Sequence, residues 1–480
     1  MSILKPILTP KVKINITFGL NYGLAPYFMK KILAFVSLLC VSHLFAQEDS
    51  TAKEKIAFDG MDFTWQNGSD RRDSSVLKTK YFTPLIMLDA NVTHSFNNPI
   101  DNTVVGSTAL ARNNEIQVSA VHIGGDFSYH NTRAHIVAQF GTRSTLIPRN
   151  DISIYRGQYQ LSDVYRYLAE ANAGYHFNKW YGINLDFGMF MSYIGLNSYY
   201  QVENWEYQAS FTSDNTPWFF NGMRLQMFPA KKLKIELWAI NGWQSYNSFN
   251  NTPGFGGNLT WSPNENIKLL TNDYYGHDAA GYTGRMRFHS DNSLLIRYFK
   301  RPKAKGISQM AFSLTGDIGF EKGDGVNGFK SDSVLGPEQY FVSLMFYNRT
   351  WFYKNKIAWT FGGGMMNNPG RYLVLAPPGD ASPFPNPANP TQTLGTHPFT
   401  TNPGDQFAGW DCSTNIDIMP TSNLTFRFEY VHREANVNYF AGHGGVTSPT
   451  GYSTTPLPAG WKPDLVKHED RVIFAVLFRL

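Results

Sequence analysis

Arginine residues recur at alternate positions in the segment 285–299, where they could act on charged solutes. If the segment is a β-strand, side chains two residues apart project from one face. The polar residues on that face are Arg285, Arg287, His289, Asp291, Ser293 and Arg297. A row of guanidinium groups on the wall of a water-filled passage would create a field that favours anions. The alternative, which the sequence leaves open, is a wall of mixed charges that neutralise one another.

Polar residues recur with the same alternation in other segments and are further candidates for the lining of such a passage. They are Glu429 with Arg427, Asp411 with Asp417, Arg224 with Gln226, and Glu170 with Asn172. Polar side chains on one face of a strand are typical of a wet interior.

His432 raises the question of hydrolysis, because it falls on the apolar face of its segment. Barrel phospholipases of the outer membrane carry a lipid-facing histidine beside a serine. The neighbours expected at this height are 407–409 on one side and 466–469 on the other, and neither stretch contains a serine. A triad without its nucleophile has no support, so we interpret His432 as an interfacial histidine.

Two other kinds of site have equally little support. The run Gly323–Gly328 matches the spelling of a dinucleotide-binding loop, but the following FKSDSVLGPEQ shows no apolar helical period. We therefore expect a loop between strands. No closely spaced set of histidine and cysteine ligands occurs, and Cys412 is the only cysteine after residue 46. The sequence predicts no catalytic residue, no cofactor and no metal.

The elements that position the candidate residues are strands, recognisable by a period of two. Leu233, Ile235, Leu237 and Ala239 alternate with polar or aromatic residues, and the chain ends on the alternating decapeptide RVIFAVLFRL. In that decapeptide Val472, Phe474, Val476, Phe478 and Leu480 share one face. Ile473, Ala475, Leu477 and Arg479 share the other.

The lengths of the connections alternate as well. Seven short turns lie near 130–133, 178–180, 229–232, 263–266, 302–305, 353–355 and 420–422. Eight longer loops lie near 97–114, 144–162, 191–215, 244–254, 276–284, 322–337, 367–406 and 435–465. Fifteen connections require sixteen strands, and short turns on one side with long loops on the other are typical of an outer-membrane barrel. The predicted fold is an all-β, transmembrane, antiparallel up-and-down barrel.

The physical reason for closure is that lipid offers no partner to an unpaired backbone amide. A barrel of about sixteen strands also has a lumen too wide for its own side chains to fill. Apolar residues therefore face lipid and polar residues face water. A soluble sandwich or propeller would have shorter strands and more even loops.

The start of the chain indicates export. Met29-Lys30-Lys31, a short apolar core at 32–41 and a small residue at Ala46 are the parts of a signal peptide. We expect an over-extended start at 1–28, a signal peptide at 29–46, a periplasmic segment at 47–80 and the barrel at 81–480. Removing residues 1–46 removes five lysines, so 42 basic against 37 acidic residues becomes 37 against 37. This neutral balance gives no support to nucleic-acid binding.

The third long loop, Ser192–Asn215, is unusually aromatic for a segment in water. In general porins the third loop folds inward. Glu203, Glu206 and Asp214 could then stand opposite the arginines as a constriction. The alternative is that the loop's aromatic residues pack along the inner wall as a plug.

Longer motifs resemble a known family. FGMFMSYIGLNSYY and the following TPWFFNGMRLQMFP, IELWAINGWQSYNSFNN and FGGNLTWSPNENIKLL are similar to the OmpL-like β-barrel porin family. WTFGGGMMNNPGRYLVL, FEYVHREANVNYFAGHGG and LVKHEDRVIFAVLFRL resemble the same group, so the similarity covers essentially the whole exported chain. It implies an outer-membrane barrel of porin type and offers no catalytic residues.

The expected function is passive diffusion of small hydrophilic solutes, with a lean toward anions, across the outer membrane of a Gram-negative bacterium. The expected partners are outer-membrane lipid, the solutes and the barrel-assembly machinery, which would read Phe474, Phe478 and Leu480. The sequence leaves open whether three copies of the chain form a homotrimer. The alternative function is a barrel enzyme or a surface-binding barrel that uses its long outer loops.

Overall fold

The computed structural model describes residues 55–68, 77–148, 151, 159, 161–248, 252–278, 282–330, 338–369, 372–373, 384–386, 389–394, 407–452 and 458–480. The segments expected as an over-extended start (1–28) and as a signal peptide (29–46) lie outside these residues.

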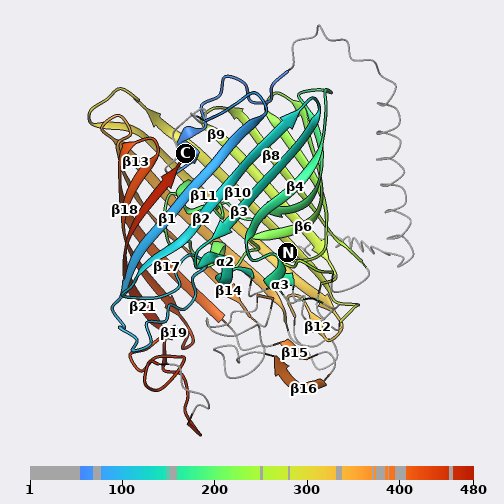
Figure 1. Ribbon diagram of the computed structural model, residues 1–480. Helices are drawn as coiled ribbons and strands as arrows, with labels where there is room; N and C mark the ends of the chain where they lie inside the picture. Colours follow the sequence, from blue (N-terminus) through green and yellow to red (C-terminus); the bar gives the residue numbers. More distant parts are fainter. Residues whose placement is uncertain are drawn as a thin grey trace, which may run out of the picture. The chain divides into compact units, whose positions relative to one another are not determined.

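The strands form one antiparallel sheet that closes on itself (Figure 1). The wall consists of β1 (Phe82–Ser95), β2 (Ile116–Tyr129), β3 (Thr132–Phe140), β4 (Leu168–Phe177), β5 (Ile183–Met191), β6 (Phe219–Ala230), β7 (Leu233–Ile240), β8 (Gly254–Asn264), β9 (Ile267–Gly276), β10 (Met286–Lys300), β11 (Ile307–Gly323), β13 (Tyr340–Phe352), β14 (Ile357–Asn368), β17 (Phe407–Thr421), β18 (Leu424–Ala435) and β21 (His468–Arg479). Pairing of β21 with β1, from Arg471 opposite Ser95 to Arg479 opposite Met87, closes the wall. The predicted sixteen-stranded barrel is confirmed.

Connections of two lengths gather at opposite ends of the barrel. The short turns and the C-terminus lie at the upper end of the barrel in Figure 1, and the long loops extend from the lower end. Gly323–Gly328 forms the turn from β11 into the two-residue β12 (Val326–Asn327), as expected of a loop between strands. Asp324 and Gly325 adopt φ values of 39° and 85° there, which suits a tight turn.

The last strand has apolar residues on both faces. Val472 and Phe474 face outward, and the Phe474 ring lies 4.7 Å from that of Phe428 on β18. Ile473, Ala475 and Leu477 face inward and are almost completely buried. An apolar inner face is unusual for a water-filled lumen. In this barrel the third long loop packs against that face.

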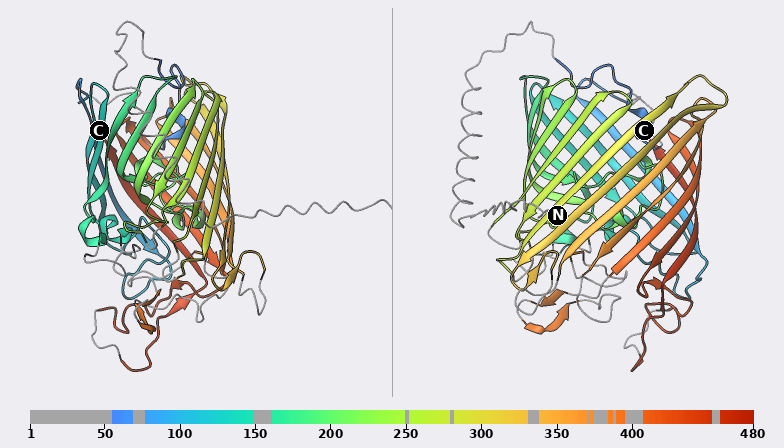
Figure 2. Two further views of the ribbon diagram at one scale, coloured as in Figure 1. Left: turned by 90° about the vertical axis from the view of Figure 1, so that its right-hand side faces the viewer. Right: turned by 180° about the vertical axis from the view of Figure 1, so that it is seen from behind.

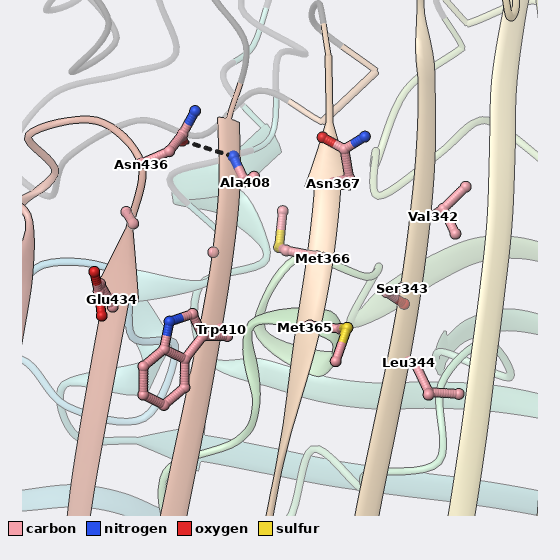
Figure 3. Close-up of a pocket in the computed structure, with 12 residues that line it drawn as sticks. Val342, Ser343, Leu344, Met365, Met366, Asn367, Ala408, Trp410, Glu434 and Asn436 are labelled. Carbon is pink, nitrogen blue, oxygen red and sulfur yellow. Dashed lines mark hydrogen bonds between the residues drawn. The ribbon is translucent and has the colours of Figure 1, made fainter.

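The outer face also carries an apolar groove between β13, β14, β17 and β18, with a volume of about 580 Å³. Figure 3 shows Met365 on β14 and Trp410 on the neighbouring β17. Leu344 of β13 and Glu434 of β18 lie toward the two edges of the groove. The groove lies on the outer side of the wall, so it forms no part of the lumen.

Short elements occupy the connections. They are η1 (Thr64–Gln66), α2 (Arg143–Leu146), α3 (Leu161–Val164), η4 (Gln201–Glu203), α4 (Phe211–Asp214) and the small strands β15 (Phe384–Asn386), β16 (Asn389–Leu394), β19 (Phe440–Ala441) and β20 (Leu465–Val466). Within the part of the chain that the structure describes, no helix has the length and apolar character needed to cross a membrane.

The N-terminal segment 55–68 lies at the short-turn end of the barrel (Figure 2). Its Phe58 packs edge-on against Phe228 of β6, with ring centroids 6.3 Å apart. Asp62 is 2.7 Å from a guanidinium nitrogen of Arg297. Burial would raise the pKa of Asp62, but hydrogen bonds from Thr64 and Arg297 and the Arg297 charge hold it well below its usual range. The segment is therefore fixed to the inner wall by an ion pair.

At the long-loop end, Asp101 joins the first and last long loops. Its carboxylate accepts hydrogen bonds from the Val446 amide at 2.7 Å and from the Thr447 amide and hydroxyl at 2.8 Å each. Burial would raise the pKa of Asp101, but these donors outweigh it, and the pKa lies below its ordinary value.

We expect this contact to weaken in acid. Because the pKa of Asp101 is lowered in the folded state, its stabilisation is present above the unfolded value of about 3.9 and is lost as the pH falls toward the folded pKa. Hydrogen exchange around Val446, corrected for intrinsic rates, should show less protection near pH 3 than at pH 6. Asp101→Asn should lower protection at both pH values, by about 1–3 kcal/mol at pH 6, and remove the pH dependence. A pH dependence retained in Asp101→Asn would contradict this assignment.

Candidate functional site: a lumen partly filled by the third loop

The third long loop, 192–218, packs along the inner wall. Tyr199, Trp205, Tyr207 and Phe211 are at most 5% exposed. Tyr199 and Tyr207 belong to an apolar cluster with Ile473, Ala475 and Leu477 of the last strand. The loop therefore buries the apolar inner face of β21, which agrees with the plug described among the sequence alternatives.

Carboxylates of the wall hold the backbone of this loop. Glu429 of β18 accepts hydrogen bonds from the Tyr207 amide at 2.6 Å and the Gln208 amide at 2.7 Å. Asp411 of β17 accepts one from the Phe211 amide at 2.7 Å and one from the Ser210 hydroxyl at 3.1 Å. Hydrogen bonds to a charged acceptor are stronger than neutral ones, so these contacts fix the loop in one position.

Arginines of the wall hold the carbonyl groups of the same loop. Arg349 donates to the Trp205 carbonyl at 3.1 Å, and Arg427 donates to the Asn204 carbonyl at 2.8 Å. Both guanidinium groups also bind Asp417, at 2.7 Å from each. Arg349 further donates to the Gly68 carbonyl at 2.9 Å. The wall, the third loop and the N-terminal segment therefore meet at Arg349.

The acidic residues of the loop do not pair with the arginines of β10, and a constriction formed by them stays a prediction. Glu203 pairs with Arg479 of β21. Glu206 accepts a hydrogen bond from Asn197 within the loop. Asp214 lies 3.0 Å from Arg433 of β18. The second half of the loop is held mainly by β13 to β21, which carry the matching arginines and the apolar face of β21. Its first half bonds to other strands, with the Tyr199 hydroxyl on Gln139 of β3 and the Tyr200 hydroxyl on Glu170 of β4.

The arginines of β10 are engaged by carboxylates. Arg287 pairs with Glu321 at 2.5 Å and lies 3.6 Å from Asp278. Arg297 binds both Asp62 and Glu265 and is fully buried. These contacts favour the alternative of a neutralised wall over an open row of positive charge.

The other predicted members of the β10 row have separate environments. Arg285 precedes β10, and its guanidinium donates to the Asp324 carbonyl at 2.8 Å. His289 is buried and its ring bonds to the Tyr372 hydroxyl at 2.9 Å. Asp291 lies on the inner face beside Asp317 of β11. The structure therefore does not bring the six polar residues of this row together as one charged surface.

Water reaches a different part of the inner wall, on β3 to β9. Exposed fractions of the side chains are 32% for Arg133, 20% for His135, 15% for Glu170, 18% for Arg224 and 24% for Lys234. By contrast, the side chains of Arg349, Arg427, Arg433 and Arg471 are fully buried. Of the predicted lining residues, Glu170 and Arg224 lie on the accessible side. Asp411, Asp417, Arg427 and Glu429 lie beneath the third loop.

Asp186 organises this accessible wall. It lies 2.8 Å from Arg224 on the neighbouring β6 and 3.3 Å from Arg133, two strands away on β3. The intervening residue on β4 is Gly174, where an added Cβ would stand 2.4 Å from the Asp186 carboxylate. Glycine is therefore required for the aspartate to reach across the strand. Sequence reasoning missed Arg133, Asp186 and Lys234, although the inward parity of their strands could have revealed them.

The surroundings of His432 differ from the sequence expectation. Its cross-strand neighbours are Cys412 and Asp470, not 407–409 and 466–469, so the expected register is wrong. The His432 ring bonds to Asp470 at 2.8 Å and lies 4.9 Å from the Trp410 ring. The register places no serine beside His432.

One protein-family model matches most of this chain. The family model described as "Putative beta-barrel porin-2, OmpL-like" matches residues 87–455. No curated protein matches this chain.

Several solved structures are similar to this chain at low identity. The outer membrane channel DcaP of Acinetobacter baumannii is 10% identical, with a TM-score of 0.46, and the match covers 85% of this chain and 100% of that one. OprB of Pseudomonas putida is 8% identical, with a TM-score of 0.46 and coverage of 84% and 94%. An anion-selective porin from Comamonas acidovorans is 7% identical, with a TM-score of 0.44 and coverage of 83% and 99%.

The family model spans most of the barrel, from β1 to the last long loop. The closed wall, its outward apolar residues and its partly accessible ionic interior agree with that match. The chain belongs to the OmpL-like family of β-barrel porins and is a porin-type channel protein of the outer membrane.

Proposed function

We propose that this barrel lets small hydrophilic solutes diffuse passively along the β3 to β9 side of the lumen. The observation that supports the proposal is the group of accessible charged side chains on that side, opposite the wall that the third loop covers. The cell would be a Gram-negative bacterium, and residues 29–46 would direct export. Planar bilayers with the purified protein should show stable conductance steps. A membrane that stays closed at every voltage and salt concentration would contradict the proposal.

The charges of the proposed passage are mixed. Its basic residues are Arg133, Arg224, Lys234 and the half-buried Lys268. Its acidic residues are Asp126, Glu170, Asp186 and Glu236. The acidic Asp186 and Glu236 are more deeply buried than Arg224 and Lys234, whereas the Asp126 side chain is 64% exposed. We propose that solutes passing Arg224 and Lys234 meet mainly these basic groups, which would produce a mild preference for anions there.

A comparison of two variants tests which wall sets selectivity. Arg224→Gln with Lys234→Gln should shift the permeability ratio toward cations, because it removes two accessible positive charges. Arg287→Gln should shift it less, because Arg287 is enclosed by two carboxylates and the rings of Trp243 and Tyr372. Reversal potentials under a salt gradient measure the ratio. A larger shift in Arg287→Gln would instead indicate that the arginines of β10 set the ion selectivity.

The assembly proposals concern the outer face. Phe474 and Phe478 alternate along the seam strand, and we propose that they and Leu480 form the signal for the barrel-assembly machinery. Phe478→Ala should then lower the amount of folded protein in the outer membrane. Arg112→Ala should not, because Arg112 forms only an exposed ion pair with Glu115 in a loop. A homotrimer stays a prediction, which sedimentation in detergent would test.

The absence of enzymatic activity is also a proposal. The alternative of a barrel enzyme finds no serine beside His432 in the observed register. Incubation with phospholipid vesicles should therefore release no fatty acid. Release that is lost in His432→Ala would favour the enzyme alternative.

A further inference from the structure

Two lysines project into the lumen near the short-turn end of the barrel. Lys234 is the second residue of β7, and Lys268 is the second residue of β9. Lys234 shares the inward parity of the buried Glu236, and Lys268 shares that of the buried Asn272. Only β8 lies between the two strands, and its Thr260 stands directly opposite Lys234. The two lysines therefore line one stretch of the inner wall.

A serine of β8 lies beside Lys268. Trp261 of β8 pairs with Leu269 of β9. One residue nearer to the turn, Ser262 and Lys268 both face the lumen. The hydroxyl of Ser262 has no hydrogen-bond partner in the part of the chain that the structure describes. It can therefore donate to a molecule that approaches Lys268 from the lumen.

The two lysines differ in their partners. Lys234 donates to the Glu236 carboxylate at 3.0 Å. Lys268 forms neither a hydrogen bond nor an ion pair with any residue that the structure describes. The charged group that acts on Lys268 is the ammonium of Lys234, which has the same sign. Lys268 is thus a lumen-facing cation without a counter-charge from the protein.

Other carboxylates at the short-turn end are already engaged. Asp62 and Glu265 both bind Arg297, at 2.7 and 3.0 Å. Lys300 lies 3.3 Å from Asp62 and 2.7 Å from Glu265. The ammonium of the half-buried Lys268 therefore stays uncompensated. A charge withdrawn from water is costly unless an opposite charge meets it, and a mobile anion would supply that opposite charge.

The local charge selects the class of anion. Lys234 and Lys268 carry two positive charges and Glu236 carries one negative charge, which leaves one positive charge at neutral pH. A carboxylate balances this charge, whereas a phosphate dianion would exceed it. Building on the diffusion proposed above along β3 to β9, we propose that Lys268 and Ser262 bind the carboxylate group of a small organic anion as it crosses the lumen. The ammonium and the hydroxyl can each donate to one carboxylate oxygen.

Conductance in potassium acetate tests the site in planar bilayers. The wild-type conductance should saturate as the acetate concentration rises, because a bound anion must leave before the next one enters. Lys268→Gln should raise the concentration for half-saturation by about tenfold, as expected when a hydrogen bond to a charged group is lost. Lys300→Gln is the matched control, because Lys300 is also partly exposed but is paired with two carboxylates. Its half-saturation should equal that of the wild type.

Two further variants separate a binding site from a general positive field. Lys268→Arg should retain most of the affinity, because it retains the charge. Ser262→Ala should raise the concentration for half-saturation by about 2- to 10-fold, yet it should change the anion/cation permeability ratio less than Lys268→Gln does, because it removes a donor and no charge. Unchanged half-saturation in both Lys268→Gln and Ser262→Ala would overturn the site. Tighter binding of phosphate than of acetate would overturn the assignment to a carboxylate.

A measurement without current distinguishes this site from the proposed diffusion. The purified protein in detergent is treated with a water-soluble succinimidyl ester, and mass spectrometry measures acylation of the Lys268 amine. Sodium acetate should slow this acylation relative to that of Lys300, compared with sodium chloride at the same ionic strength. A conducting channel without saturation and without protection of Lys268 would overturn the carboxylate site alone. A closed channel in which acetate protects Lys268 would overturn the diffusion proposal and support the site.

Discussion

Shortening the third loop is expected to increase the single-channel conductance several-fold. If a short Gly-Ser linker replaces residues 197–214, the lumen loses the segment that packs on β21 and covers the arginines of β13 and β18. The wall should remain closed, because Asp417 still pairs with Arg349 and Arg427. Planar-bilayer recordings measure the conductance, and the far-ultraviolet circular dichroism spectrum reports whether the barrel is intact.

Asp101→Asn is a suitable control for this experiment. It loosens a contact between outer loops and leaves the residues around the third loop unchanged. Its conductance should match that of the wild type. An unchanged conductance in the shortened-loop variant, with an intact barrel, would mean that solutes do not pass where the loop lies.

The second large effect is expected for Arg427→Ala, which should lower the free energy of unfolding by about 3–5 kcal/mol. The Arg427 and Asp417 side chains are both fully buried and lie 2.7 Å apart. Removing the guanidinium leaves Asp417 with Arg349 alone and leaves the Asn204 carbonyl without this donor. Equilibrium unfolding in urea, followed by tryptophan fluorescence in lipid vesicles, measures the change.

Arg112→Ala provides the matched comparison. Arg112 also forms an ion pair, with Glu115 at 2.7 Å, but its side chain is 51% exposed. Exposed pairs contribute about 0–1 kcal/mol, so this variant should be nearly as stable as the wild type. A loss in Arg427→Ala no greater than that in Arg112→Ala would show that the buried pair does not hold the third loop.

These experiments address a division of the lumen into two sides. On β13 to β21, buried arginines and carboxylates bind the backbone of the third loop. On β3 to β9, charged side chains remain partly accessible to water. The first side has a structural role, whereas we propose that the second side meets the solute.

Much of the wall could be predicted from the sequence. The alternation in RVIFAVLFRL correctly placed Val472 and Phe474 on one face and Ile473 and Leu477 on the other. Turn and loop lengths correctly predicted sixteen strands and their two ends. Both properties are local, because side-chain direction follows from a two-residue period and each turn depends on a few adjacent residues.

The partners of the inward residues could not be predicted in the same way. Arg297 meets Asp62, 235 positions away, and Tyr207 meets Glu429, 222 positions away. The apolar inner face of β21 indicates that another segment covers it, but does not identify that segment. Strand parity shows that a side chain enters the lumen; which loop reaches it depends on the curvature of the closed wall and on the path of a long connection. Only the tertiary structure decided that the arginines of β10 are neutralised and that arginines of β13, β18 and β21 hold the second half of the third loop.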